Sequence, residues 1–572
     1  MKSLIRKIFF FFLFISFIFC SQVLAFTKIV DTVFDGMPVD PEKISETLDT
    51  IKKNKLKNKT ITNPLKLKPD KLFTIYAMQA DPLNIKIEID TSGNAVRSKK
   101  DIQLPVSNEE FLDKVTEAIM IWEEVDIAKI KFAPVKFASG QADPEDGKNV
   151  ITFRAIEDKD AGGSVVTIIN FAKTDTVIFM NKTIMVKPGT ILDADIIIDP
   201  ANNPCVALTT TEGPLKAGGD DSSPTIEGGI NPDIPAEDLD ACAGKIIGGD
   251  LTGLLVEGLG DVLGLTGSAI TSSATSPVSK IMARYALTND DKIGLANIYP
   301  NPEKVKALGT LQGKVILNKK PVRGAHIVIE DVMTGEPVAS AVSDIVGKFK
   351  ITAIPGGTYN VYAEPLDGPI RKKGIPLNFF GFTAVLNFTT GLYPEPVVIS
   401  GGKTTKITVE VHELSASAFN INYQTNVLKE ADVNETGGSA LLPIKISPGQ
   451  TLTNLQFWGD NISTAFGTLS VSGPGITVSN VMNTSIMISP NVVCEDCEDT
   501  PESMCNRSSL CPPAQELTDE PDQVNGITAD ITCASDVTPG PRNIIFTGDQ
   551  LDPASPSFGL RDQITGGLFV TE

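Results

Sequence analysis

The apolar and polar positions of this chain divide it into a short apolar start, a region of mixed periodicity and two strand-rich regions. The start combines the basic segment MKSLIRK, the run IFFFFLFISFIFC and small residues at Val23 and Ala25, which is the pattern of a cleaved signal peptide. We therefore expect residues 1–25 to be removed on export, with a retained signal anchor as the alternative. No later segment is apolar over enough residues to cross a bilayer.

The next part of the chain changes from a weakly patterned leader to a mixed domain. We interpret the Lys-rich residues 26–79 as a leader or linker. Alternation in LNIKIEID and in four later segments predicts strands, and residues 109–126 predict a helix with Asn108 as its N-cap. Residues 80–302 are thus expected to form an α+β domain, a twisted mixed sheet plus helices. The apolar residues at helical spacing are Phe111, Val115, Ile119 and Trp122.

A segment without regular pattern interrupts this domain. Residues 201–248 are rich in Gly, Pro, Asp, Ser and Thr, and they predict an insertion. Cys205 and Cys242 flank it, and in an exported protein such a pair favours a disulfide that clamps the insertion. Two unpaired buried thiols are the alternative.

After residue 302 the pattern becomes one of short alternating strands with Gly and Pro turns. Residues 308–413 predict a β-sandwich. Residues 442–572 predict a second, Ig-like β domain, interrupted by a Cys-rich insert at 494–533. The expected fold class is therefore multidomain, with an α+β domain followed by two β-sandwich domains.

Charge and histidine content narrow the functions that this chain can have. Lys and Arg number 50 against 70 Asp and Glu, and the net charge is −20. Such acidity argues against nucleic acid or anionic lipid as a partner. His326 and His412 are the two histidines of the chain, and we expect each to be a surface or edge residue.

The cysteines outside the signal peptide are odd in number, so at least one thiol is free or pairs between chains. Haem attachment at CEDC is excluded because Glu498 stands where a histidine is needed. A zinc knuckle is the alternative to disulfides here, although the spacings within it are unequal. The candidates for disulfides in this region are Cys494, Cys497, Cys505, Cys511 and Cys533.

Residues 80–302 resemble the matrixin branch of the metzincin metalloproteases at several places in the same order. The resemblance lies in the helix that ends at Trp122 and in DGKNVITF, ILDADIIID, LLVEGLGDVLGLTGS and LTNDDKIGLANIYP. Met282 in IMAR would form the Met-turn beneath the metal. The resemblance implies a zinc endopeptidase with three histidine ligands and a glutamate base in the pattern H-E-x-x-H-x-x-G-x-x-H.

The chemical positions of that pattern are all replaced in this chain. With the pattern's glycine on Gly264, the first, second and third histidines correspond to Glu257, Asp261 and Gly267, and the base corresponds to Gly258. Glycine can neither take a proton nor ligate through a side chain. Glu257 and Asp261 share a helix face, as weak cation candidates or as a solvated acidic face. We therefore predict no catalytic residue and no zinc.

The strand-rich regions resemble modules that are common in exported proteins. Residues 308–413 resemble the carboxypeptidase regulatory-like (transthyretin-like) domains through GKVILNKKPVRGAHIVIEDVMTGEPV and PGGTY. Residues 442–572 resemble IPT-type or Ig-like modules through SGPGITV and TPGPRNIIFT. These resemblances imply spacers or binding surfaces without chemistry of their own.

Taken together, the sequence favours a secreted, catalytically inactive matrixin-like protein that binds a protein, a glycan or a cell surface. The expected location is extracellular or at the cell surface, with the periplasm as an alternative. One rival hypothesis is a metalloendopeptidase with an unconventional site that uses Glu257 and Asp261. The other is an architectural surface or adhesion protein.

Overall fold

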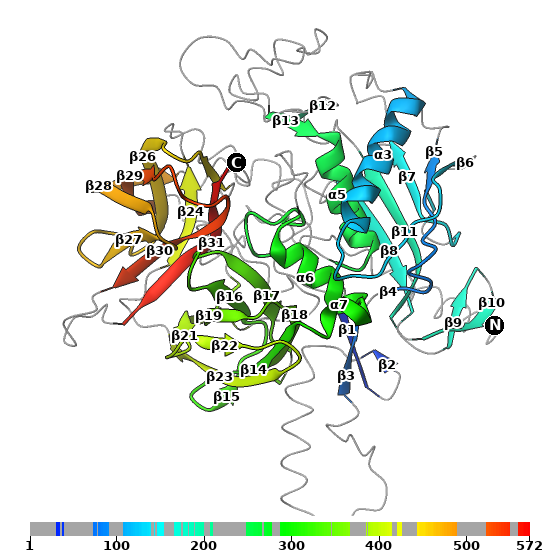
Figure 1. Ribbon diagram of the computed structural model, residues 1–572, viewed down its shortest axis with the longest axis horizontal. Helices are drawn as coiled ribbons and strands as arrows, with labels where there is room; N and C mark the ends of the chain where they lie inside the picture. Colours follow the sequence, from blue (N-terminus) through cyan, green and yellow to red (C-terminus); the bar gives the residue numbers. More distant parts are fainter. Residues whose placement is uncertain are drawn as a thin grey trace, which may run out of the picture.

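The structure is a computed structural model of the chain (Figure 1). It describes residues 30–34, 37–38, 72–76, 78–90, 107–138, 142–143, 146–153, 165–172, 176–180, 182–187, 189–198, 206–209, 247–265, 268–276, 287–344, 346–366, 385, 387–413, 420–425, 443–488, 522–548 and 559–571.

The region that we expected to be a leader or linker contains a small antiparallel sheet. Its central strand β1 (Val30–Phe34) pairs with β2 (Met37–Pro38) on one side and with β3 (Leu72–Tyr76) on the other. The pairing of β1 with β3 joins segments that are far apart along the chain, so local periodicity does not predict it.

The first domain has a mixed sheet in the order β4-β11-β7-β5-β6, with β8 antiparallel to β11 and the other pairs parallel. The domain also has two separate two-stranded sheets, the antiparallel β9–β10 and the parallel β12–β13. The strands are β4 (Met78–Gln79), β5 (Glu88–Asp90), β6 (Lys136–Ala138), β7 (Val150–Phe153), β8 (Val165–Phe171), β9 (Thr176–Phe179), β10 (Lys182–Met185), β11 (Thr190–Ile198), β12 (Val206–Thr209) and β13 (Ile247–Asp250).

The first helix of this domain forms where the spacing of apolar residues predicts it. α3 (Asn108–Glu123) buries Phe111, Val115, Ala118, Ile119 and Trp122 against the sheet. Its N-cap is Ser107 rather than the expected Asn108, because the Ser107 hydroxyl accepts a hydrogen bond of 3.1 Å from the Glu110 amide. Local composition could not separate two adjacent capping residues.

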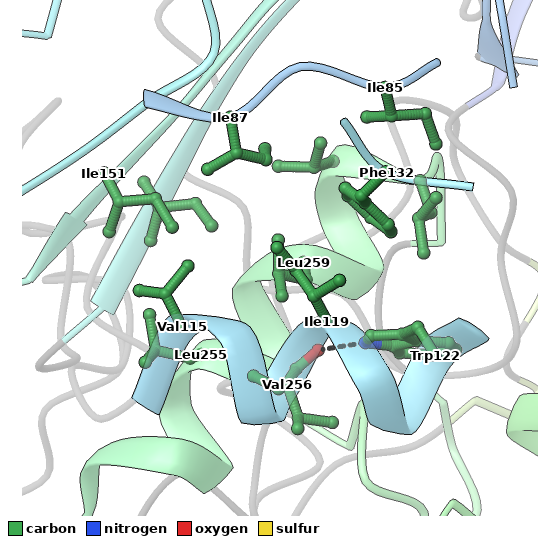
Figure 2. Close-up of a cluster of buried hydrophobic side chains, with 14 of the residues drawn as sticks. Ile85, Ile87, Val115, Ile119, Trp122, Phe132, Ile151, Leu255, Val256 and Leu259 are labelled. Carbon is green, nitrogen blue, oxygen red and sulfur yellow. Dashed lines mark hydrogen bonds between the residues drawn. The ribbon is translucent and has the colours of Figure 1, made fainter. Parts of the chain in front are cut away.

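The second helix, α5 (Leu251–Val262), lies beside α3 on the same face of the sheet (Figure 1). The indole of Trp122 donates a buried hydrogen bond of 2.9 Å to the carbonyl oxygen of Val256 (Figure 2). α5 ends in a Schellman turn, in which the amide of Leu265 donates to the Gly260 carbonyl and Gly264 has a φ of 88°. Two further helices follow, α6 (Asn289–Ile298) and α7 (Pro302–Val305).

The first β-sandwich has two sheets around one apolar core. One sheet has the order β15-β14-β23-β20 with β18 on β14, and the other has the order β17-β16-β19-β21 with β22 on β19. Their strands are β14 (Gly309–Leu317), β15 (Lys320–Pro321), β16 (His326–Asp331), β17 (Pro337–Val342), β18 (Lys348–Ile354), β19 (Gly357–Glu364), β20 (Phe388–Thr389), β21 (Gly391–Leu392), β22 (Val397–Ile399) and β23 (Thr404–Glu413).

The second β-sandwich also has two sheets, in the orders β24-β26-β29-β28 and β25-β31-β30-β27. It includes β24 (Asn420–Thr425), which lies before residue 442, where we expected this domain to begin. The pairing of β24 with β26 puts it in this sandwich. The other strands are β25 (Ile444–Ile446), β26 (Thr451–Asp460), β27 (Gly467–Val471), β28 (Ile476–Ile488), β29 (Asp522–Cys533), β30 (Gly540–Gly548) and β31 (Arg561–Val570).

Within the described residues, no helix combines the length and the apolar character needed to cross a membrane.

Candidate functional site

The positions of the degenerate motif that the structure describes lie on α5. Glu257 and Asp261 are half-buried on one face, as their spacing of four residues predicts. Gly264 forms the turn that ends the helix. Gly267 and the expected Met-turn residue Met282 lie outside the described residues.

Gly258, which corresponds to the base in the expected matrixin resemblance, is buried against the sheet. A Cβ atom there would lie 3.0 and 3.1 Å from side-chain carbons of Ile196 on β11. Gly260 is similarly close to Trp122, 3.1 Å from a ring carbon. These two glycines allow α5 to approach the sheet and α3 closely. In this structure, the Gly258 position faces apolar side chains rather than a polar cleft.

The two histidines are both in the first sandwich, and their surroundings differ. His412 on β23 is exposed, as expected. His326 on β16 is only 1% exposed, so its expected place at the surface or an edge is wrong. Its Nδ1 atom lies 2.6 Å from Oε1 of Glu364. The cause is tertiary, because residues of the first domain and of the second sandwich cover this sheet.

His326 belongs to a buried polar cluster where the three domains meet. We call this cluster the three-domain junction. It consists of Asp290 from the first domain, His326, Glu330, Tyr362 and Glu364 from the first sandwich, and Asn543, Gln563 and Thr565 from the second sandwich.

Glu364 joins the two sandwiches within the junction. Its Oε2 accepts a hydrogen bond of 2.7 Å from the Gln563 side chain, and its Oε1 accepts one of 3.0 Å from the Thr565 hydroxyl. The side-chain nitrogen of Asn543 donates to Oε2 of Glu330 at 2.6 Å and to the Tyr362 hydroxyl at 3.1 Å. Both carboxylates are almost fully buried and have lost their hydrogen bonds to water. The donors from the second sandwich replace those hydrogen bonds.

Asp290 joins the first domain to the first sandwich. Its Oδ1 accepts a hydrogen bond of 2.6 Å from the backbone amide of Ser340, and its Oδ2 accepts one of 2.6 Å from the Ser268 hydroxyl. Burial raises the pKa of the Asp290 carboxyl to about 6. His326 also acts on this carboxyl electrostatically and favours its charged form.

The segment that follows α5 lies under the second sandwich. Residues 268–276 are almost entirely buried, and the amide of Thr271 donates a hydrogen bond of 2.9 Å to the carbonyl oxygen of Thr565. Gly566 faces this segment so closely that a Cβ atom there would lie 2.6 Å from the Ser272 hydroxyl oxygen. Residues that follow the motif in sequence therefore contribute to a domain interface.

Asp291 holds the same segment to the start of α6. Its side chain accepts hydrogen bonds from Ser273 and Thr275, and it forms a capping box with Thr288. The acidic pair at the start of this helix thus has a structural role, with Asp290 directed to the first sandwich and Asp291 to the segment after α5.

Two buried carboxylates on β11 were not singled out from the sequence. Asp193 and Asp195 point away from the helices, and each accepts a backbone hydrogen bond, of 2.6 Å from Gly147 and of 2.9 Å from Val150. Burial, together with the nearby charge of Asp195, raises the pKa of Asp193 to about 8. The alternation in ILDADIIID contained the signal, because it places both aspartates on one face of a central strand.

We expect Asp193→Asn to stabilise the protein more as the pH rises. The folded state binds a proton at Asp193 between the unfolded pKa near 4 and the folded pKa of about 8, so wild-type stability falls as the pH increases across this range. The side-chain oxygen of asparagine can still accept the hydrogen bond from the Gly147 amide, but it carries no charge. Denaturant unfolding should show a gain on the order of 3 kcal/mol at pH 9, and much less at pH 5.

Asp126→Asn is the matched control, because that carboxylate is 68% exposed beside Lys304 and should change stability little at either pH. An equal effect of Asp193→Asn at pH 5 and pH 9 would contradict the assignment of the buried charge.

Among the described residues Cys533 has a free, buried thiol. The expectation that it forms a disulfide stays a prediction, because its candidate partners lie outside the described residues. The side chain belongs to the apolar core of the second sandwich. The other disulfide candidates lie outside the described residues: Cys205, Cys242, Cys494, Cys497, Cys505 and Cys511.

Comparisons with known proteins give no family for this chain. No family model matches the sequence, and no curated protein matches it. The minor pilin GBS52 of Streptococcus agalactiae shares 13% identity and a TM-score of 0.13, over 20% of this chain and 47% of its own length. The major pilin SpaD of Corynebacterium diphtheriae shares 10% identity and a TM-score of 0.15, over 45% of this chain and 64% of its own length.

A putative carbohydrate-binding protein of Bacteroides uniformis shares 9% identity and a TM-score of 0.13, over 44% of this chain and 94% of its own length. TM-scores of this size do not show a shared fold. The resemblance of the first domain to the matrixins therefore stays a prediction.

Proposed function

We propose that this chain is an exported, non-catalytic architectural or adhesion protein of the cell surface, in which the three domains act as one rigid unit. The observation that carries the proposal is the three-domain junction. Charged and polar side chains of the junction are buried and bonded across domain boundaries, where independently moving modules would keep them in water. The strongly acidic composition and the apolar start that predicts export favour the same assignment.

The first domain would be a matrixin-like framework that has lost its chemistry. The structure has a mixed sheet covered by two helices here, and Gly258 lies against Ile196 where the family has a base. Neither histidine of the chain lies in this domain. Its interface with both sandwiches supports a structural use for the segment that follows α5.

Metal and peptidase assays on the purified full chain test this proposal. We expect less than one tightly held zinc per molecule. We also expect no chelator-sensitive cleavage when the chain is incubated with peptide libraries. The reason is that the motif lacks all three histidine ligands. The matched variants Glu257→Ala and Asp261→Ala should leave the zinc content and the absence of peptide cleavage unchanged. Chelator-sensitive cleavage that disappears in these variants would instead establish the unconventional endopeptidase.

A further inference from the structure

The first and last strands of the first sandwich lie side by side and run parallel. β14 pairs with β23 over eight residue positions, from Thr310 with Thr404 to Leu317 with Val411. The chain enters β14 directly from α7 of the first domain, and it leaves β23 towards the second sandwich. The two strands that connect this domain to its neighbours are thus bonded to each other.

The hydrogen bonds between these strands form a continuous ladder. The amide of Thr310 donates to the carbonyl oxygen of Lys403 at 2.9 Å, on the β23 side. The amide of Val315 donates to the carbonyl oxygen of Gly347 at 2.8 Å, on the β18 side. Because successive amides of a strand point to opposite sides, the even-numbered residues of β14 donate towards β23 and the odd-numbered ones towards β18.

Apolar side chains cover the core face of this ladder. Leu311 and Val315 on β14 are fully buried, as is Val409 on β23, and Val411 is 1% exposed. These side chains belong to the core that both sheets share. The alternate residues face outward and include the exposed Lys314, Thr408 and Glu410, so water is excluded from the core face of the ladder only. On that face water has little access to replace a strained hydrogen bond, which makes each bond more costly to break.

The direction of the pair decides how it responds to tension. In a parallel pair the amino ends of both strands lie at the same end of the ladder. Tension applied at the start of β14 and at the end of β23 therefore slides one strand past the other. All hydrogen bonds of the ladder are then loaded together, whereas pulling both strands from one end would open them one after another.

We propose that the first sandwich is a load-bearing link, which resists tension transmitted along the chain through shear of the β14–β23 pair. This inference rests on the proposed architectural function at the cell surface. The three-domain junction involves β16 and β19 of the opposite sheet, so its release under load leaves the β14–β23 ladder intact.

Single-molecule force spectroscopy on the full wild-type chain tests the proposal by changing the direction of pulling. Handles are attached through azide-bearing residues, so that the cysteines are left unmodified. One preparation carries them at Lys306 and Glu413, which loads the ladder in shear. The other carries them at Lys306 and Lys403, which opens the ladder from one end. We expect a severalfold higher unfolding force in the first geometry, and equal forces in the two geometries would overturn the proposal.

A proline substitution identifies the ladder as the source of the resistance. Lys314 on β14 is exposed, and its amide belongs to the set that faces β23, so Lys314→Pro removes a ladder hydrogen bond. Lys350 on β18 is exposed in the same sheet, but its amide points away from β14. Lys350→Pro is therefore the matched control, as an edge-strand proline that removes no ladder bond.

Lys314→Pro should lower the unfolding force in the shear geometry, and Lys350→Pro should leave it at the wild-type value. A force that both prolines lower equally would contradict the assignment to this strand pair. If Lys314→Pro does not fold, the two pulling geometries of the wild type still decide the question. Failure here leaves the zinc and peptidase results untouched, so the load-bearing inference and the proposed function can fail separately.

Discussion

Gly335→Ala should release the second sandwich from the first without unfolding either one. Gly335 lies in the hairpin between β16 and β17 with a φ of 72°, and a Cβ atom there would overlap the backbone of Ser472 and Gly473. These are backbone atoms of the other sandwich, so no side-chain rotation can make room. The Ser472 hydroxyl also donates a hydrogen bond of 2.5 Å to the Gly335 carbonyl oxygen, and this contact would be lost.

Calorimetry of the full chain would show the release as a change in the number of transitions. The wild type should unfold its two sandwiches together, because junction carboxylates of one accept hydrogen bonds from the other. Gly335→Ala should separate them into two transitions, and a protease should then cut between them. Each sandwich keeps its own apolar core, so both remain folded.

Gly559→Ala is the matched control for backbone strain. Gly559 has the same φ of 72°, but among the described residues a Cβ atom there would meet nothing within 4 Å beyond its chain neighbours, so only the left-handed conformation is penalised. That penalty is about 1–2 kcal/mol and is shared by both variants. If Gly335→Ala lowers stability only as much as Gly559→Ala and keeps one transition, the two sandwiches do not depend on this contact.

Gly258→Glu, which introduces the residue type that matrixins use as a base, should strongly destabilise the first domain and give no peptidase activity. The new side chain would start 3.0 Å from Ile196, in a region where the helix buries nearly every residue. Burying an unpaired carboxylate there costs on the order of several kcal/mol. The histidine ligands would still be absent, so no zinc-bound water could form.

The pH dependence of this variant separates charge from size. Burial raises the pKa of such a carboxyl in the folded state above its unfolded value, so the variant should regain stability as the pH falls. Gly258→Gln has nearly the same volume without the charge and should show no such recovery. Gly258→Ala adds only the Cβ atom, and thermal unfolding should show a much smaller loss. Equal losses in Gly258→Glu and Gly258→Gln at every pH would show that the size of the side chain, and not its charge, decides the loss.

Local elements were predictable wherever one face of an element is buried against its own domain. The residues at helical spacing in α3 are all buried, because four-residue spacing reports a single apolar face. The strand-rich pattern after residue 302 indicated sandwiches for a similar reason. The second sandwich includes β24, which precedes the expected start at residue 442, because β24 pairs with β26 and local alternation does not connect these segments.

The surroundings of individual polar residues were not predictable. His326 was expected at the surface or an edge, but the sheet that carries it is covered by other domains. Asn543 and Glu330 are 213 residues apart in the chain and bond directly. Cys533 is buried in the apolar core of the second sandwich, which cysteine counting does not reveal.

By itself, the sequence determined that this chain lacks the histidines of a metzincin zinc site and that its net charge is strongly negative, since both depend only on which residues are present. It also indicated α3 and the strand-rich regions after residue 302, since periodicity records burial on one face. Only the tertiary structure decided that Gly258 faces Ile196, that Asp193 is buried, and that carboxylates join the domains. These features depend on contacts between distant segments, and no local pattern of apolar and polar residues encodes which distant segment will cover a given side chain.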